Sequence, residues 1–524
     1  MQLQINFCIQ GNKNMKHSMM RVAVAATLGL SALAANAGQI GVNVGATLAA
    51  EYITSAVVVN QPTITFQTAN LINDGASVVY HVRFSAGSMK AADGGVVPTS
   101  AKAAGAAAAD VVLYLNGTAT AVANYSVSAS TADTDGLGYY FTVSSVAGTG
   151  GIPANTVVNI LTGNAKIASL TSALGAGGTV TGSVGYTTTA GDFSGVSTWV
   201  EAPTTATILT SAKALSQAVK SSGATATGYY TAAETSQVNV NTSLKSLTAT
   251  TAASAATAAT GSTTLINLGA TKLAVNTALA RPAGGTAAAA DFGNVTFAAT
   301  GDFSVATATA YLASTSDCLA ANTTAAGTIS TDGKSVSFAA VTPAVATAVN
   351  YLCYSVPGTK VIPYNVQYAI GAASVAAQTA AAPNTIASTG TAGNVYLLTS
   401  NGASVVVPAF VPSTGTAGNG YNTYLRVINT GNLTSDIYVA AYNSTTGVVG
   451  TASKLVSQLP SGGSAMLDTN TVSTALGLTA NSWNTLLVTG NTSKLAVQPL
   501  LVNPAGVITN LSAVNGGNNA ATAN

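Results

Sequence analysis

The sequence of 524 residues is long enough for about three domains of ordinary size. Charged residues make up only 6% of it, against roughly 25% in an average soluble protein, and its mean hydropathy of +0.41 excludes a disordered chain, because disorder combines low hydrophobicity with high net charge. Three of the 17 basic residues, Lys13, Lys16 and Arg21, lie in the N-terminal segment. The other 14 are balanced by 15 acidic residues, so the sequence shows no excess of positive charge that would indicate binding to a nucleic acid.

The N-terminal segment has the pattern of a secretory signal peptide. Lys16 and Arg21 supply its positive start, and the apolar stretch VAVAATLGLSALA fills residues 22–34. This stretch is too short to span a membrane comfortably, and a polar chain follows it. Residues 1–37 are therefore predicted to direct export, with an uncleaved anchor or a buried helix as the alternative.

The predicted cleavage site has two small residues separated by one position. Ala35 and Ala37 fill these positions, so cleavage would leave Gly38 as the first residue of the exported chain. Met15 begins a signal of ordinary length by itself, and residues 1–14 are interpreted as an extension from an upstream start codon.

Residues 38–203 are predicted to form a β-sandwich, because short β-type runs alternate with turn residues. In the run SVVYHVRF, Val78 and Tyr80 share one face with every second residue after them, while His81 and Arg83 lie on the opposite, partly exposed face. The predicted strands cover residues 78–84, 111–115, 139–143 and 157–161.

The segment DTDG places Asp133 and Asp135 just before a glycine, on one side of a tight turn. Carboxylate oxygens are the ligands that Ca²⁺ prefers, so the pair is a calcium candidate. No acidic residue stands at the twelfth loop position of an EF-hand. A hairpin turn in which the aspartates bond their own backbone is the other interpretation.

Residues 204–285 are very rich in Thr and Ala and are predicted to form an extended, partly β connector. Apolar pairs such as Ile208 with Leu209 suggest interspersed strands. Residues 211–220 are a possible short helix instead.

A second β-sandwich is predicted over residues 286–385, where the order of strands resembles that of the first. It contains Cys318 and Cys353, the two cysteines that remain once Cys8 leaves with the signal segment. An exported chain meets an oxidising compartment, so this even pair predicts a disulfide. A pair of buried free thiols is the alternative. The predicted strands cover residues 294–297, 308–312, 335–338, 349–354 and 366–369.

Residues 386–524 are predicted to form an immunoglobulin-like domain. One short helix is expected over residues 471–476, with Asn470 as its N-cap and Gly477 as its stop. The predicted strands cover residues 396–398, 404–410, 424–428, 437–442, 486–488 and 495–502. The fold class is therefore all-β, with tandem immunoglobulin-like β-sandwich domains and a Thr/Ala-rich connector.

The second half of the chain resembles surface-layer and related secreted surface proteins of proteobacteria. The resemblance rests on NTYLRVINTG at 422–431, IYVAAYNSTTGVVG at 437–450, LAVQPLLVNPAGVITNLS at 495–512, and SVPG and IPYNVQYAI at 355–358 and 362–370. These are strand and turn patterns without chemistry. The resemblance implies a structural surface protein and transfers no catalytic residue.

Catalysis is not expected from this chain. His81 is the only histidine after the signal segment, which leaves no Ser-His-Asp or multi-histidine metal site. A secreted chain with few charged groups is suited to packing against copies of itself. The first hypothesis is therefore a self-assembling subunit of a surface layer on a Gram-negative bacterium, held by an outer-membrane or lipopolysaccharide anchor, without a cofactor other than structural calcium.

Two further hypotheses share the export signal and the β-rich sequence. One is a surface adhesin or glycan-binding protein that uses loops at the ends of the sandwiches. The other is an outer-membrane β-barrel, which the low aromatic content of 6% and the polar C-terminal sequence GGNNAATAN disfavour.

Overall fold

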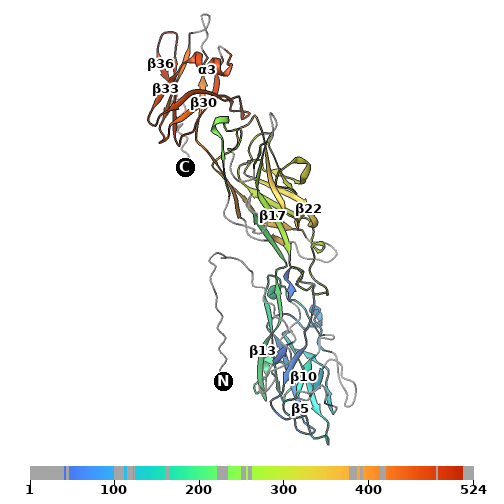
Figure 1. Ribbon diagram of the computed structural model, residues 1–524. Helices are drawn as coiled ribbons and strands as arrows, with labels where there is room; N and C mark the ends of the chain where they lie inside the picture. The colour runs from blue at the N-terminus through green and yellow to red at the C-terminus, as the bar shows by residue number, and fades with distance from the viewer. Residues whose placement is uncertain are drawn as a thin grey trace, which may run out of the picture.

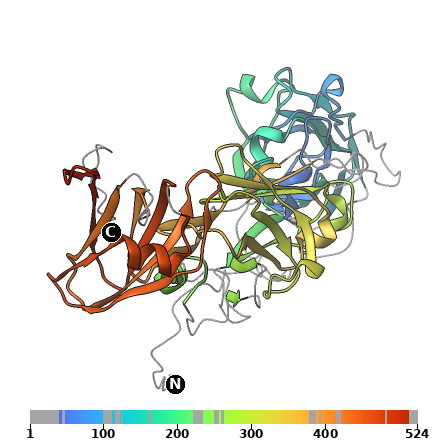
Figure 2. The ribbon, with the colours of Figure 1, turned by 90° about the horizontal axis from the view of Figure 1, so that it is seen from above.

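The computed structural model describes residues 40–42, 47–98, 111–114, 122, 124–160, 165–220, 234–248, 255–257, 263–376, 386–389, 393–412, 420–479 and 482–511. Within these residues the sheets pack in pairs as consecutive β-sandwiches, each around its own apolar core. Figure 1 shows the sandwiches stacked along the length of an elongated molecule, and Figure 2 shows the C-terminal sandwich set to one side of the other two. The predicted all-β class with tandem sandwiches is confirmed.

The first sandwich holds two main sheets and a two-stranded ribbon. Its core contains Tyr80, Val82 and Phe141, so the alternation predicted for the strand at 78–84 is confirmed on the inward face. One sheet has the order β1 (Ile40–Val42), β4 (Ile64–Gln67), β10 (Val157–Ile160), β6 (Val111–Tyr114). The other has the order β2 (Leu48–Ala49), β13 (Glu201–Ala212), β12 (Thr179–Thr187), β5 (Ser77–Phe84), β9 (Gly138–Ser145), β7 (Tyr125–Val127), with β8 (Thr131–Ala132) on β9. The ribbon pairs β3 (Val59–Asn60) with β11 (Lys166–Ile167), and the short helices are η1 (Ala50–Tyr52), η2 (Ala91–Asp93), α1 (Thr171–Leu174) and η3 (Phe193–Gly195).

The second sandwich begins directly after the first. Its first sheet has the order β14 (Leu215–Lys220), β17 (Thr263–Val275), β23 (Asn350–Pro357), β19 (Thr309–Ala313), β20 (Thr323–Ala326), with β16 (Ala255–Thr257) on β17. The other has the order β15 (Glu234–Val238), β27 (Gly393–Ser400), β24 (Val366–Ile370), β18 (Val295–Thr300), β22 (Ser335–Val341), β21 (Thr328–Ile329), with β25 (Ala373–Val375) and β26 (Ile386–Thr389) beside it. Its short helices are η4 (Val240–Thr242), η5 (Ala289–Asp291), η6 (Ala320–Asn322) and α2 (Pro343–Ala346).

The third sandwich packs two sheets around a core with Leu425, Val439 and Val488. One sheet has the order β28 (Ala403–Phe410), β34 (Asn484–Gly490), β30 (Ser435–Asn443), β31 (Val448–Val449), with β32 (Ser453–Leu459) on β30. The other has the order β33 (Ser464–Leu467), β29 (Asn422–Asn429), β35 (Leu495–Val502), β36 (Ile508–Asn510). The helix α3 (Thr469–Leu476) stops at Gly477 as predicted, but Asp468 caps it in place of Asn470, because the Asp468 carboxylate accepts the N–H of Thr471 at 2.8 Å.

The sheet pairings correct the predicted connector at residues 204–285. Strand β13, which contains Ile208 and Leu209, completes the first sandwich, and β14 and β17 pair with each other inside the second. The possible helix over 211–220 is wrong, because these residues end β13 and form β14. Thr is a β-branched residue that fits a pleated strand, so a Thr/Ala-rich composition did not require a linker here.

The boundary predicted at residue 386 also differs from the pairing. β27 runs antiparallel to β24 and parallel to β15, which places it in the second sandwich. Glu234 lies opposite Tyr396 in this parallel pair. A pairing across so long a stretch of chain leaves no local pattern in the sequence, because a parallel neighbour needs a crossover connection.

The junction between the first and second sandwiches is buried and hydrogen-bonded. The Glu51 carboxylate accepts the N–H groups of Ala214 and Leu215 at 2.8 and 2.9 Å, at the point where the chain passes from β13 to β14. The Tyr52 hydroxyl donates to Asp291 of the second sandwich at 2.6 Å. These contacts fix the two sandwiches relative to each other.

The junction between the second and third sandwiches shares an apolar core. Ala440 and Leu487 of the third sandwich pack into the core of the second. Around this contact the N–H of Val449 donates to the carbonyl of Thr359 at 2.7 Å, and the Lys245 ammonium donates to the carbonyl of Gly450 at 2.7 Å. The chain is therefore held as one elongated body at both junctions.

Candidate functional site

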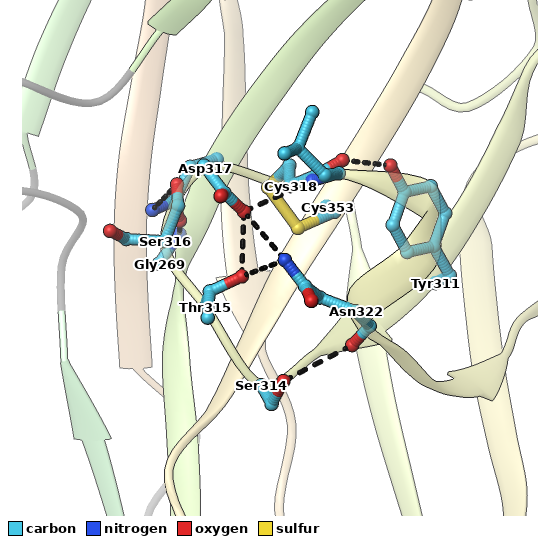
Figure 3. The surroundings of a disulfide bond; sticks show 11 residues. Gly269, Tyr311, Ser314, Thr315, Ser316, Asp317, Cys318, Asn322 and Cys353 are labelled. Carbon is cyan, nitrogen blue, oxygen red and sulfur yellow. Dashed lines mark hydrogen bonds between the residues drawn. A yellow bond between two sulfur atoms is a disulfide. The ribbon is translucent and has the colours of Figure 1, made fainter.

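The predicted disulfide between Cys318 and Cys353 is confirmed. It ties the loop at residues 314–322 to β23 of the second sandwich, with 5.6 Å between the two Cα atoms (Figure 3). Both cysteines are buried, and the Tyr311 hydroxyl donates to the carbonyl of Cys318. The cross-link therefore fixes this loop against the outer face of the sheet.

The disulfide loop is also held by a network around Asp317. Its carboxylate accepts the Thr315 hydroxyl at 2.6 Å and the N–H of Leu319 at 3.1 Å, and Asn322 donates to the same oxygen (Figure 3). The hydrogen bond from Thr315 is the main reason that the pKa of Asp317 is lowered. With its thiols oxidised and its carboxylate occupied, the loop has a structural role.

Asp133 and Asp135 lie in the turn between β8 and β9, beside Arg83 on β5. The Arg83 guanidinium lies 2.7 Å from the Asp135 carboxylate and 3.8 Å from that of Asp133. The N–H of Gly136, whose φ is 78°, donates to the carbonyl of Asp133 at 2.9 Å, and Asp135 accepts the N–H of Leu137 at 2.9 Å. These bonds are those of the hairpin-turn interpretation.

The same turn provides only part of a metal site. In the portion of the chain that the structure describes, no three His, Cys, Asp or Glu side chains converge on a point where a metal ion could bind. The positive group beside Asp133 and Asp135 is Arg83. The calcium interpretation of this pair is therefore left to a chelation experiment, whereas the hydrogen bonds of the turn match the hairpin interpretation.

Asp133 is buried although it is a carboxylate. Its side chain is almost inaccessible, and neither oxygen has a hydrogen-bond partner in good geometry. Burial raises the pKa of Asp133 to about 6, although Arg83 and the backbone of Phe193 act in the opposite direction. This carboxyl therefore changes charge near neutral pH.

His81 is buried, which corrects its predicted position on a partly exposed face. A segment at residues 188–199 between β12 and β13, here named the strap, folds over this face of the sheet. The His81 ring centroid lies 5.4 Å from that of Trp199, 6.3 Å from that of Phe193 and 5.7 Å from that of Tyr140 on β9. His81 is 0% exposed as a result.

Neither ring nitrogen of His81 has a hydrogen-bond partner in good geometry. Burial lowers the pKa of His81, because a charged imidazolium would lose its hydration under the strap. The aromatic cover favours the neutral ring over the charged one.

Polar contacts fasten the strap to the rest of the sandwich. Asp192 of the strap accepts the backbone N–H of Thr134 at 3.1 Å and the Thr134 hydroxyl. The Arg83 guanidinium lies 5.4 Å from the centre of the Phe193 ring, in a cation–π contact. The cluster of Arg83, His81, Asp133 and the strap is thus one packed unit whose charges depend on pH.

The strap could have been recognised in the sequence from its aromatic residues, although they follow no strand pattern. Phe193 and Trp199 are large aromatic residues in a Gly- and Ser-containing loop, where a solvent-exposed loop would carry polar residues. Aromatic side chains in such a loop indicate that it covers an apolar surface.

The predicted cleavage residues Ala35, Ala37 and Gly38 lie outside the described residues. Among the residues that the structure describes, no helix has the length and apolar character needed to cross a lipid bilayer.

Comparisons with known proteins show only distant structural likenesses. No protein family matches the chain, and no curated protein matches it significantly. Several solved structures share a distant likeness with the chain. A biofilm-associated protein (BSP domain) is 9% identical with a TM-score of 0.18, covering 90% of this chain and 80% of its own. The major pilin subunit BcpA of Bacillus cereus is 9% identical with a TM-score of 0.23, covering 76% and 91%. A partial N-terminal region of an enterococcal surface protein is 10% identical with a TM-score of 0.18, covering 69% and 95%. Likenesses this weak add nothing to what the sheets themselves establish.

Proposed function

We propose that the chain is an exported structural subunit of a bacterial cell-surface layer that assembles with copies of itself. The observation that supports this proposal is the elongated body of β-sandwiches with buried junctions at Glu51 and at Ala440. A rigid, repeating contact geometry requires that the parts of a subunit keep a fixed relative position. Flexible linkers between the sandwiches would not provide it.

The composition supports the same proposal. With 6% charged residues, the surface is covered mainly by hydroxyl and small apolar groups. Such a surface is poorly protected against association, and neighbouring subunits would cover it. The disulfide between Cys318 and Cys353 fits an oxidising compartment outside the cytoplasm.

The proposal includes the export of the subunit, its location on the cell and its anchor. The signal-like residues 1–37 support export. We place the assembled protein outside the outer membrane of a Gram-negative bacterium, with an outer-membrane protein or lipopolysaccharide as its anchor. No cofactor is required for this role.

Electron microscopy of washed cells tests the proposal. Wild-type cells should carry a regular surface array that is absent after deletion of the gene. An intact array in the deletion strain would exclude the chain as its subunit.

An adhesin is the second candidate, and Trp483 is the observation that favours it. The Trp483 side chain is 65% exposed just before β34. An exposed indole offers a stacking surface for a sugar ring. A glycan array probed with wild-type protein and with Trp483→Ala separates the candidates, because only an adhesin should bind a glycan and lose that binding in the variant.

A further inference from the structure

Large outward-facing side chains are covered in several parts of the molecule. The strap covers His81 on the first sandwich. The disulfide loop covers Tyr311 on the second. The second sandwich covers Ala440 and Leu487 on the third. The sheet that contains β29 differs, because Met466 and Ile508 on its outer face are exposed and the other large side chains there are only half-buried.

This outer face, here named the β29 face, is identified by the alternation along the strands. Leu425 and Val427 lie in the core, so Tyr424, Arg426 and Ile428 point outward. The register places Met466 of β33 opposite Arg426 and Leu500 of β35 opposite Tyr424, and Ile508 of β36 extends the same face. Met466 is 54% exposed and Ile508 is 65% exposed. The β29 face consists of Tyr424, Arg426, Ile428, Met466, Leu500 and Ile508.

The charge of this face is fixed by one residue. Arg426 is exposed and is the only charged residue on strands β29, β33, β35 and β36. A partner surface should therefore bring an acidic group together with apolar contact area.

The opposite end of the molecule has this combination. The first sandwich meets the second near Ala212, and the register of β12 with β13 and β5 places Ser77, the start of β5, at the far end. The loops at this end, residues 68–76 and 146–155, are here named the distal tip. Leu71 in the distal tip is 52% exposed, and Asp74 is the only charged residue in the two loops.

Asp74 is held in its ionised form. Its carboxylate accepts the N–H groups of Gly148, Thr149 and Gly150 at 2.7, 3.0 and 3.2 Å. These bonds, with that of Gly148 the strongest, lower the pKa of Asp74. The distal tip therefore presents a permanent negative charge beside an exposed apolar side chain.

The net charges of the two ends are also opposite. Residues 38–212 contain eight acidic and four basic residues, whereas residues 403–524 contain three basic and two acidic residues. Opposite charges at the two ends favour an end-to-end arrangement of copies over contacts between like ends.

We propose that the β29 face of one copy docks on the distal tip of a second copy, with Arg426 against Asp74 and Leu71 against the apolar residues around Arg426. The inference rests on the proposed self-assembly and names the surfaces that carry it. A contact between two different surfaces of the same chain does not close on itself, so it builds an open filament. Lateral contacts between filaments would then form a layer.

Sedimentation velocity of the full chain over a range of concentrations tests the contact. Arg426→Glu should raise the dissociation constant of the end-to-end contact by roughly tenfold or more. Leu71→Thr should weaken it as well, without touching the bonds that Asp74 makes. The matched control is Lys494→Glu, which makes the same charge change at an exposed position of the third sandwich outside the β29 face.

A double variant provides the decisive measurement. Arg426→Glu combined with Leu71→Lys should recover part of the lost association, because the new lysine beside Asp74 gives the introduced glutamate an opposite charge on the distal tip. Thermal unfolding of each variant checks that it is folded. Recovery together with an unaffected Lys494→Glu control would support the contact.

Two results would overturn the inference, and they are distinguishable. If the wild-type chain assembles and Arg426→Glu assembles equally well, the surfaces are wrong while the proposed function remains. If the wild-type chain stays monomeric at every concentration, the proposed function fails, and this contact fails with it.

Discussion

The Glu51 carboxylate accepts the N–H of Ala214 at 2.8 Å and that of Leu215 at 2.9 Å, in a buried environment where β13 of the first sandwich passes into β14 of the second. One side chain thus satisfies two backbone donors where the chain leaves the first sandwich. A charged acceptor makes these bonds stronger than those between neutral groups. Glu51 therefore contributes to the rigidity of the first junction, on which the proposed function depends.

Glu51→Ala should loosen the first junction. The change leaves two buried N–H groups without an acceptor, at a cost of about 1–3 kcal/mol for each. We expect faster proteolytic cleavage near residues 212–215 and a broader distribution of end-to-end distances in small-angle X-ray scattering. Glu51→Gln keeps one acceptor and should show a smaller effect.

The control for Glu51 is Asp332→Ala, because Asp332 is an exposed carboxylate in a turn of the second sandwich. Cleavage of Glu51→Ala at the wild-type rate, with an unchanged scattering profile, would show that the junction does not depend on this residue.

Removing the disulfide should destabilise the second sandwich. The cross-link closes a loop with a sequence separation of 35 residues, for which the chain-entropy relation gives about 3–4 kcal/mol. Cys318→Ser with Cys353→Ser should lower the urea midpoint of this sandwich, as followed by hydrogen exchange of β23. Reductant should have the same effect on the wild-type chain and none on the variant. A wild-type midpoint that does not respond to reductant would contradict this prediction.

The strands were predictable where the pattern is local. In the run from Ser77 to Phe84, every second side chain enters the core, and the sequence displays this alternation directly. The position of β27 was not predictable in the same way, because its partner β15 lies far away in the chain. The export signal and the disulfide followed from residue type and compartment, and of these two the structure tests only the disulfide.

The candidate site was less predictable than the fold, for a physical reason. The environment of His81 depends on a strap that is distant in sequence and has no regular periodicity. Alternation along a strand shows which residues share a face, but it does not show whether a loop covers that face. The N-cap of α3 is a related case, since both Asp468 and Asn470 suit the position and only the helix start at Thr469 decides between them.

Removal of calcium should leave the first sandwich unchanged. Arg83 already provides the positive charge between Asp133 and Asp135, at 3.8 and 2.7 Å. We expect the same thermal midpoint with and without a chelator. A midpoint that falls on chelation in the wild type, but not in Asp133→Asn with Asp135→Asn, would establish a calcium site at this turn.

Docking of the strap should weaken below neutral pH because of His81. Its pKa is lowered under the strap relative to the ordinary value of about 6.5. As the pH falls, the undocked state therefore binds a proton at a higher pH than the docked state does. Docking is most stable above pH 6.5 and loses stability as the pH falls below that value. In a Trp483→Phe background, Trp199 is the only tryptophan, and its emission should shift to the red as the pH falls below about 6.5.

The variant His81→Phe should remove this shift. A phenyl ring keeps the contacts with Trp199 and Phe193. It loses only the interaction of the imidazole with the backbone of Thr189, which does not reach good hydrogen-bond geometry. An acid-induced shift of the same size in His81→Phe would mean that another group controls the strap.

Asp133 should act in the opposite direction to His81, and the two effects can be separated. Because the pKa of Asp133 is raised to about 6 by burial, the docked state binds a proton more readily than the undocked state, in which the ordinary value of about 3.9 applies. Its contribution to docking therefore grows as the pH falls from about 6 to 4, while that of His81 declines.

Asp133→Asn removes the compensation, so the Trp199 shift should begin at the same pH and become steeper. Asp93→Asn, at an exposed carboxylate of the same sandwich outside the strap, should leave the profile unchanged. A shallower profile in Asp133→Asn would show that the Asp133 carboxyl holds the strap in its charged form, beside Arg83.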